Sequence, residues 1–250
     1  MNMDCSALTS ISSITLHAKE LSIHTASLVL LSNDNEKRVQ CTEITMNFKA
    51  TTCKLVFEEK ANVTNLNDCK LAMKFSGFLN DQMAGFYRSK YVDVHGKQKY
   101  MASTQFEALD ARRAFPCCDE PALKATFGLT LFVPGHFTAL SNMPVKSVHT
   151  RVDDDSNGGD VVKEFVFMKS PIMSTYLLAF CVGEFDCLQG VTNDTGTAIS
   201  VYTPPGQSHK GQFALDVGLK CLQFYNSFFE VPYPLPKLDM VAIPEFSAGM

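Results

Sequence analysis

Residues 101–127, MASTQFEALDARRAFPCCDEPALKATF, hold the chain's densest cluster of charges of mixed sign, and they lie between two apolar segments typical of strands. The cluster contains one amide and seven charged side chains: Gln105, Glu107, Asp110, Arg112, Arg113, Asp119, Glu120 and Lys124. Charges this close to core strands lose part of their hydration, so they either pair with one another or face a pocket that receives a ligand. The stretch therefore predicts a rigid polar site.

Two prolines bracket a short turn within this stretch. Pro116 and Pro121 each fix a φ angle and lack a backbone N–H, so we expect a stiff elbow between them. We interpret Arg112, Asp119 and Glu120 as an ion-pair cluster that holds this elbow in place.

The same stretch resembles the aminopeptidase N-type zinc metallopeptidases, with the puromycin-sensitive aminopeptidase branch as the closest match. The resemblance rests on TQFEA at 104–108, DARRAFPC at 110–117, DEP at 119–121 and KA at 124–125. Three further matches follow in the family's order: MAGFYRSKY at 83–91, PIMSTYL at 171–177 and VPYPLPKLD at 231–239. The resemblance runs from about Ile14 to Met250.

This resemblance implies a mostly β fold in two parts. Residues 1–198 would form the family's saddle-like antiparallel β-sheet domain, without its first strands, because nothing before Ile14 clearly matches them. Residues 199–250 would begin a thermolysin-like catalytic domain, with its first strand at about 199–202. The family's proteins are several times longer, so we expect an N-terminal piece of a zinc aminopeptidase.

The resemblance also assigns substrate-binding roles. Glu107 would bind the α-ammonium group of a peptide substrate, and Gln105 would line the pocket for its first side chain. Ala248, Gly249 and Met250 would belong to a Gly-x-Met-Glu-Asn loop that holds the substrate backbone. Met250 is either the variable residue of that loop or its own methionine, and both readings stay open.

The metal is the second implication of the resemblance. The family uses zinc, bound by a His-Glu-x-x-His helix and a more distant glutamate, and that motif does not occur in these residues. The six histidines are dispersed, and none is paired at the i, i+4 spacing of a zinc-binding helix. We therefore expect no metal ligand and no catalytic residue in this chain, which would be inactive alone.

The residues themselves leave alternatives for the two main candidates. Residues 105 and 107 project from one side of a strand if the strand continues that far. Glu107 could instead form an ion pair with Arg112 or Arg113, and Gln105 could be an amide satisfied within its strand. The residues alone favour the ion pair for Glu107, and the family resemblance reverses this preference; for Gln105 the reversal is weaker.

Alternating apolar residues predict most of the strands. They occur at Ile14/Leu16, Leu21/Ile23, Ala26/Leu28/Leu30, Ile44/Met46/Phe48, Leu55/Phe57 and Leu71/Met73/Phe75, and later at Phe127/Leu129/Leu131/Val133, Phe165/Phe167 and Tyr176/Leu178/Phe180/Val182. We expect an antiparallel sheet with one solvent-facing side, an unpaired edge near the N-terminus, and a hairpin around His95-Gly96 that leads into a strand at 99–107.

One helix is predicted near the C-terminal end. From Ser208 to about Glu230, apolar residues recur at spacings of four and three, which places Phe213, Val217, Cys221, Phe224 and Phe228 on one face. Without further chain to cover it, we expect this phenylalanine stripe to be exposed and prone to aggregate.

Composition excludes several function classes. The net charge is −4 and the basic residues are scattered, so the sequence lacks the cluster of lysines and arginines that binds nucleic acid or acidic membranes. No apolar run approaches the roughly 18 residues that span a bilayer. Nine cysteines without Cys-x-x-Cys spacing favour thiols in a reducing compartment, so we expect a cytoplasmic protein.

The sequence thus predicts a part of a zinc aminopeptidase whose partners are peptide substrates. A non-catalytic interaction module derived from the same family is the alternative from a different class, because a fold does not certify an activity. An epoxide-hydrolysing relative is a third hypothesis, which the glutamate at position 107 disfavours, since that branch resembles glutamine there.

Overall fold

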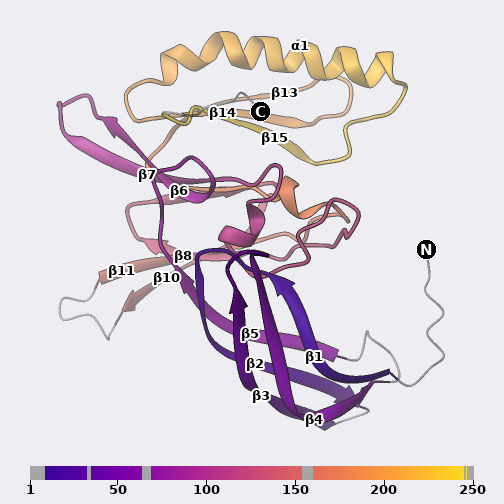
Figure 1. Ribbon diagram of the computed structural model, residues 1–250. Coiled ribbons are helices and arrows are strands. Elements are labelled where there is room, and N and C mark those ends of the chain that lie inside the picture. Colours follow the sequence, from indigo (N-terminus) through magenta and orange to yellow (C-terminus); the bar gives the residue numbers. More distant parts are fainter. Residues whose placement is uncertain (1–8, 33–34, 64–68, 154–159, 245, 247–250) are drawn as a thin grey trace. The chain divides into compact units, whose positions relative to one another are not determined.

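The computed structural model (Figure 1) describes residues 9–32, 35–63, 69–153, 160–244 and 246. The chain folds into two compact units. The first comprises Met1–Phe78 and Glu107–Leu123, and the second comprises Leu79–Phe106 and Lys124–Met250. The fold is mostly β, as the sequence predicts.

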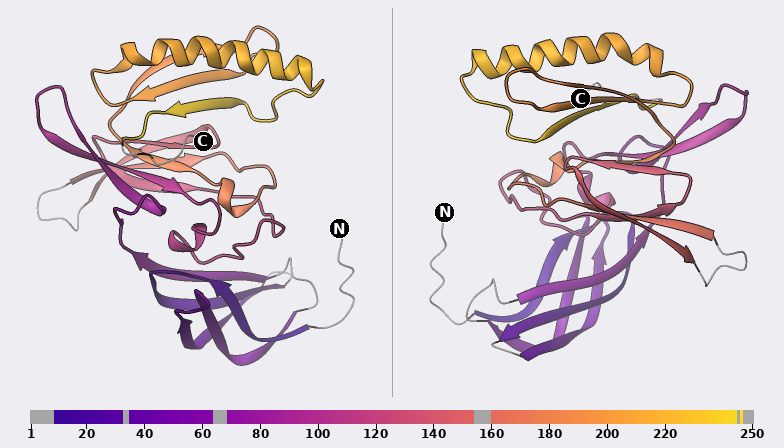
Figure 2. Two further views of the ribbon diagram at one scale, coloured as in Figure 1. Left: turned by 45° about the horizontal axis from the view of Figure 1, so that its top comes forward. Right: turned by 180° about the vertical axis from the view of Figure 1, so that it is seen from behind.

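The first unit is built on a five-stranded antiparallel sheet (Figure 2), with the strand order β1-β4-β3-β2-β5. The strands are β1 (Thr9–His17), β2 (Leu21–Ser32), β3 (Asn35–Asn47), β4 (Thr52–Val63) and β5 (Cys69–Gly77). Breaks in register between Ile11 and Ser13, Ile23 and Thr25, and Cys41 and Glu43 add twist to the sheet. This is the curled antiparallel sheet that the alternating pattern predicts.

Alternation separates the buried face of this sheet from its solvent-facing side. Leu28, Val39 and Leu55 are almost fully buried and form one core with Ala26 and Phe57. Arg38, Gln40 and Lys54, which alternate with these residues in β3 and β4, are exposed, as a period of two predicts, whereas Ser27 of β2 is buried.

The predicted strand at residues 44–48 ends one residue early. Phe48 is 85% exposed, because β3 stops at Asn47 and a turn follows. The Asn47 side-chain oxygen accepts the Ala50 N–H at 3.0 Å, which stabilises that turn in place of another strand residue.

The unpaired edge predicted near the N-terminus is β1. It pairs with β4 on one side and is the terminal strand of the sheet order among the described residues. Only at its last residue does another segment add to it: His17 and Cys117 exchange two backbone hydrogen bonds of 2.9 and 3.1 Å.

The second unit contains three sheets. One has the order β6-β7-β12-β9, one β10-β11-β8 and one β13-β14-β15. Their strands are β6 (Gly85–Val92), β7 (Gln98–Gln105), β8 (Thr130–Pro134), β9 (Thr138–Ser141), β10 (Val145–Asp153), β11 (Asp160–Phe167), β12 (Phe180–Gly183), β13 (Asp186–Val191), β14 (Ala198–Thr203) and β15 (Lys237–Val241).

The β6–β7 hairpin confirms the turn predicted around His95-Gly96. Asp93 organises it, because its side-chain oxygen accepts the backbone N–H groups of His95 and Lys97 at 2.9 and 2.8 Å. Gly96 has a φ of 79°, a left-handed conformation that glycine adopts without steric cost. The strand that leaves this turn ends at Gln105, two residues earlier than predicted.

The strand predicted at residues 176–182 is only partly correct. Thr175–Leu177 form a 3₁₀ helix, and β12 begins at Phe180. The N–H groups of Leu177 and Leu178 donate to the carbonyl oxygens of Ser174 and Thr175, so local hydrogen bonds take the place of hydrogen bonds between strands there. The apolar alternation of residues 176–178 therefore serves a short helical turn.

The last part of the chain is a βαβ unit. Strands β14 and β15 are parallel, and the connection between them contains the 3₁₀ helix Ser208–Gly211 and the helix α1 (Gln212–Phe228). Strand β13 pairs with β14 on its other side, antiparallel, so the sheet starts before the strand expected at 199–202. The helix packs on this sheet through Leu215 and Leu222 against Ile199 and Val201. The predicted helix is confirmed.

The apolar stripe singled out in the sequence is the exposed face of α1. Phe213 is 79% exposed and Phe228 66% exposed, whereas Leu215 and Leu222 on the opposite face are buried. Two apolar series share the 3.6-residue period of this helix, and the leucines are the ones that meet the sheet. The expectation that the phenylalanine stripe is exposed is therefore confirmed.

The leucine face should carry the stability of α1. Leu215→Ala is expected to lower the free energy of unfolding by about 2–5 kcal/mol, because it leaves a cavity under the helix. Phe213→Ala, two residues away on the exposed face, should change it by less than about 0.5 kcal/mol. Denaturant titration followed by the helical circular dichroism signal checks both. Equal losses for the two variants would show that the stripe is packed as well.

Candidate functional site

Gln105 lies at the end of β7, opposite Gly85 of β6. Its side chain is half-buried and lines a cavity of about 550 Å³ in the second unit. Phe106, the next residue, is buried and packs edge-on against Phe180, with ring centroids 6.1 Å apart. This aromatic contact anchors the end of β7 and so holds Gln105 at the cavity wall.

The remaining walls of this cavity come from the 3₁₀ helix, β12 and the end of the chain. They comprise Ser103, Thr104, Phe106, Tyr176, Leu177, Leu178, Ala179, Cys181, Asp239, Val241, Ala242, Ile243 and Phe246. No cationic side chain is among the described residues that line it. The cavity is therefore apolar with a few acceptor groups, a composition typical of a pocket for a small group.

Asp239 is a cavity residue that the sequence analysis missed. One of its carboxylate oxygens pairs with the Lys237 ammonium group, which also donates to the Ser141 carbonyl oxygen at 2.7 Å. The other oxygen, Oδ1, is buried and has no hydrogen-bond partner among the described residues. The signal was available: Lys237 and Asp239 are two charges at a spacing of two in an otherwise apolar strand.

Cys181 also lines the cavity but is no nucleophile at neutral pH. Burial raises the pKa of its thiol to about 12, and the nearby Asp239 carboxylate adds to the rise. A nucleophilic cysteine requires a thiolate, so the geometry argues against thiol chemistry here.

Glu107 opens the turn that follows β7, and its side chain is exposed. Because β7 ends at Gln105, Glu107 is not a residue of that strand, and the expectation that both side chains project from one strand face is wrong. The chain turns at 107–110 and enters the 3₁₀ helix Ala111–Arg113, whose Arg113 N–H donates to the Asp110 carbonyl oxygen at 3.1 Å. That local bond ends the extended conformation.

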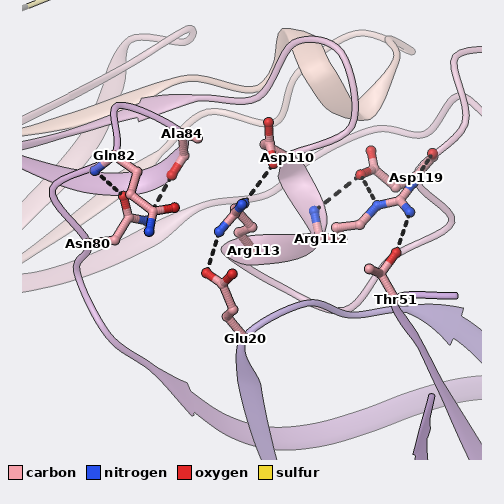
Figure 3. Close-up of polar contacts among 9 residues, drawn as sticks. All are labelled: Glu20, Thr51, Asn80, Gln82, Ala84, Asp110, Arg112, Arg113 and Asp119. Atoms are coloured by element: carbon pink, nitrogen blue, oxygen red, sulfur yellow. Dashed lines mark hydrogen bonds and ion pairs between the residues drawn. The ribbon is translucent and has the colours of Figure 1, made fainter. Parts of the chain in front are cut away.

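Arg112 is committed to Asp119 inside the first unit (Figure 3). The Arg112 Nε atom lies 2.9 Å from Asp119 Oδ2, and the side chains are only 9% and 1% exposed. The Arg112 backbone N–H donates to the same carboxylate oxygen, and its guanidinium also donates to the Asp119 carbonyl oxygen at 3.0 Å and the Thr51 hydroxyl at 2.8 Å. A buried ion pair is stable only when it is hydrogen-bonded in this way.

Arg113 is held by two other carboxylates. Its Nε atom lies 2.7 Å from Asp110 Oδ1, and its Nη1 atom pairs with Glu20, in the turn between β1 and β2. The Arg113 side chain is 11% exposed and that of Glu20 55% exposed. The two arginines therefore attach the Ala111–Arg113 turn to two separate turns of the sheet, as Figure 3 shows.

These pairings argue against the interpretation of Glu107 as an ion-pair partner of Arg112 or Arg113. Both arginines that could neutralise it are paired with other acids, and Glu107 joins no ion pair found in the described part of the chain. The predicted ion-pair cluster is confirmed for Arg112 and Asp119. Glu120, by contrast, is exposed and joins none of the ion pairs that the described residues make.

The elbow around Cys117 is tied to the end of β1. Besides the backbone bonds between His17 and Cys117, the His17 Nδ1 atom accepts the Asp119 N–H at 3.1 Å. Burial raises the pKa of Cys117 to about 12, so this thiol stays protonated. The stiff elbow is thus held by hydrogen bonds as well as by its prolines.

The MAGFYRSKY stretch begins with a turn organised by Asn80. Its side-chain amide donates to the Ala84 carbonyl oxygen at 2.9 Å, and its side-chain oxygen accepts the Gln82 N–H at 2.8 Å (Figure 3). This turn delivers β6, the partner of β7. It is a structural feature that sets where Gly85, opposite Gln105, lies.

The last three substrate-binding candidates and the metal complete the comparison with the sequence predictions. Ala248, Gly249 and Met250 lie outside the described residues. Among residues that the structure does describe, no group of three histidine, cysteine, aspartate or glutamate side chains is arranged to hold a metal ion. The side chains that the structure describes therefore do not fit a zinc ion.

Comparison with known families decides the classification. The model of the peptidase M1 N-terminal domain matches residues 1–177, and the model of the peptidase family M1 domain matches residues 213–250. The chain belongs to the M1 peptidase family. The stretches that suggested this family, at 83–91, 104–125, 171–177 and 231–239, all lie within these two matches.

Named members of the M1 family share much of the sequence. Aminopeptidase M1-C of Oryza sativa subsp. japonica is 56% identical over 74% of this chain and 20% of its own length. Puromycin-sensitive aminopeptidase of Caenorhabditis elegans is 42% identical over 94% of this chain and 24% of its own length. Alanine/arginine aminopeptidase of Saccharomyces cerevisiae is 43% identical over 96% and 26%, respectively.

This M1 chain spans about a fifth to a quarter of the length of these relatives. None of the helices that the structure describes is long and apolar enough to cross a membrane.

The Arg112–Asp119 pair should dominate the stability of the first unit. Asp119→Ala is expected to cost about 3–5 kcal/mol of unfolding free energy, because it leaves a buried guanidinium without its counter-ion. Glu120→Ala is the matched control in the same turn and should stay within about 0.5 kcal/mol of the parent. Urea unfolding measures both. A loss below 1 kcal/mol for Asp119→Ala would contradict the role given to this pair.

Proposed function

We propose that this chain supplies substrate recognition to an M1 aminopeptidase, an enzyme that removes residues from the amino terminus of peptides. Glu107 binds the free α-ammonium group, Gln105 contacts the first side chain, and Ala248, Gly249 and Met250 hold the substrate backbone. Support for the class comes from family membership and from relatives whose names are those of aminopeptidases.

The observation that carries the role of Glu107 is its freedom from the neighbouring arginines. A carboxylate that recognises an ammonium group must be ionised, accessible and not already neutralised by a protein cation. Glu107 is exposed, and Arg112 and Arg113 are bound to Asp119, Asp110 and Glu20. An exposed acid in a turn whose last residue, Asp110, is held by an ion pair with Arg113 meets this requirement.

The role of Gln105 is supported by its place on the cavity wall. A neutral amide can donate and accept, so it tolerates apolar and polar first side chains alike. A volume of about 550 Å³ is sufficient for any natural side chain. The yeast relative is named for alanine and arginine, and a pocket with acceptor groups and a roomy apolar wall is compatible with both.

The metal belongs to the proposal for the whole enzyme and not to these residues. Zinc in such an enzyme would polarise the scissile carbonyl and activate water. Because the described side chains do not fit a metal site, we assign no step at the scissile bond to this chain. What its own residues do is bind and orient the amino end of the substrate.

The proposed location is the cytoplasm. Among the described residues, none of the eight cysteines is in a disulfide, and burial keeps the pKa of Cys117 and Cys181 near 12. Cysteines that stay as thiols suit a reducing compartment.

The role of Glu107 can be tested in a chain that continues through the family's zinc-binding motif. Glu107→Gln is expected to raise KM for unblocked peptides by roughly ten- to a hundredfold, since it removes a charge-assisted hydrogen bond. Glu120→Gln, an exposed acid of the same charge, is the control and should leave KM unchanged. If Glu107→Gln also leaves KM unchanged, the assignment of the ammonium site is wrong.

Residues 1–250 on their own test whether this part of the enzyme binds the substrate without binding zinc or hydrolysing the peptide bond. We expect them to bind no stoichiometric zinc and to release no fluorophore from amino-acyl aminomethylcoumarins. The competing hypothesis, a non-catalytic interaction module, shares this outcome but predicts no binding of amino acid amides. Nuclear magnetic resonance titration with leucine amide and its N-acetylated form separates the two. Chelator-sensitive turnover would overturn the proposal.

A further inference from the structure

Asp239 lies on the face of β15 that points away from α1. Its neighbours in the strand, Leu238 and Met240, pack in the core beneath the helix. Side chains of a strand alternate between its two faces, so Lys237, Asp239 and Val241 share the opposite face. Asp239 and Val241 line the cavity that also contains Gln105, whereas Lys237 is not among the described residues that line it. The acid of this pair therefore borders the cavity, and its cation does not.

The carboxylate of Asp239 has one unused oxygen. Lys237 pairs with Oδ2, whereas Oδ1 is buried and accepts no hydrogen bond from the described residues. An ionised carboxylate can accept several hydrogen bonds, and a buried acceptor without a donor is costly. The ion pair with Lys237 and the burial of the side chain, which is 11% exposed, hold the carboxylate in place. Oδ1 is thus an oriented acceptor for a ligand that brings its own donors.

Two further side chains place this acceptor within the cavity. Ser103 lies opposite Cys181 where β7 pairs with β12, so the two side chains project to the same face, and both line the cavity. Burial raises the pKa of the Cys181 thiol to about 12, and the nearby Asp239 carboxylate adds to this rise. The buried Ser103 hydroxyl oxygen and the Asp239 carboxylate therefore border the same part of the cavity, next to Cys181.

A basic side chain matches this arrangement. Lysine and arginine combine a long apolar stem with a cationic end that donates several hydrogen bonds. The stem suits the apolar walls formed by Leu177, Leu178 and Val241, and the cationic end suits the carboxylate. Among the described residues that line the cavity there is no protein cation to repel it. A neutral side chain of the same length gains no charge-assisted hydrogen bond from Asp239.

We propose that Asp239 is a specificity-determining residue, which binds the cationic end of a lysine or arginine at the amino terminus of a peptide substrate. Oδ1 accepts the hydrogen bonds of the ammonium or guanidinium group, the Ser103 hydroxyl oxygen accepts another, and Gln105 lies beside the stem. This inference rests on the proposed function, because it places the first side chain of the substrate in the cavity that Gln105 lines.

Calorimetric titration of residues 1–250 with arginine amide and citrulline amide tests this proposal. Citrulline has nearly the shape of arginine but carries no charge. The parent chain should bind arginine amide roughly tenfold more tightly, because citrulline cannot form the charge-assisted hydrogen bond. Asp239→Asn should bind the two ligands within about twofold of each other. Asp216→Asn, which neutralises an exposed acid of α1, is the matched control and should keep the preference.

A second variant guards against a folding defect, because Asp239→Asn leaves Lys237 without its counter-ion. The double variant Lys237→Met/Asp239→Asn removes both charges and should lose the preference for arginine amide as well. Circular dichroism checks that each variant is folded. A parent chain that binds arginine amide no more tightly than citrulline amide, or a preference that survives in either folded variant, would overturn the proposal.

The N-acetylated forms of both ligands separate this proposal from the ammonium site at Glu107. Acetylation removes the α-ammonium group and leaves the side chain intact, so N-acetylarginine amide should still bind more tightly than N-acetylcitrulline amide. Acetylation that leaves the affinity for arginine amide unchanged contradicts the role of Glu107 alone. Equal affinities within the acetylated pair and within the free pair contradict the role of Asp239 alone.

Discussion

The buried pair between Arg112 and Asp119 is the constraint on which the rest of the first unit depends. It joins a short helical turn to the elbow that follows it, and through Thr51 it reaches the turn between β3 and β4. Removing two charges from water is costly, and only complete hydrogen bonding offsets the cost. Here Arg112 donates to a carboxylate, a carbonyl and a hydroxyl oxygen, so the pair behaves as a fixed cross-link.

That cross-link has a consequence for chemistry. Arg112 is a buried cation in the stretch after β7, and its side chain is bound to Asp119 rather than to Glu107. Arg113 is committed in the same way to Asp110 and Glu20. Asp110 and Asp119 of the stretch, together with Glu20, therefore satisfy the two arginines, and the other two acids of the stretch, Glu107 and Glu120, remain exposed. The proposed recognition of a substrate ammonium group requires an accessible carboxylate of this kind.

The backbone pattern was predictable from the sequence because it follows local rules. Alternation gave the strands of the first sheet, and a period of 3.6 gave α1. The errors arose where tertiary contacts decide. Gln105 and Glu107 are at a strand spacing, but β7 ends at Gln105, and a turn at 107–110 leads into the 3₁₀ helix, where the Asp110 carbonyl oxygen accepts the Arg113 N–H. In α1, leucine and phenylalanine series both fit the helical period, and only the sheet beneath selects the leucines.

Parts of the candidate site could be predicted and parts could not. The charges of Arg112 and Asp119 indicated their pairing, whereas the substrate-binding roles of Gln105 and Glu107 stay predictions. The remaining contacts of the two arginines are with residues far away in the sequence: Arg113 pairs with Glu20, and Arg112 donates to the Thr51 hydroxyl. The motif alone does not reveal them. Asp239 was missed because its place at the cavity follows from the pairing of β14 with β15 rather than from its neighbours.

A double-mutant cycle between Glu107 and Arg113 tests the central claim most directly. The unfolding free energies of Glu107→Gln, Arg113→Gln and the double variant give the coupling between the two side chains. The account predicts a coupling within about 0.5 kcal/mol of zero, while the parallel cycle between Asp110 and Arg113 exceeds it. A coupling above 1 kcal/mol between Glu107 and Arg113 would show that this carboxylate is an ion-pair partner and not a free ammonium receptor.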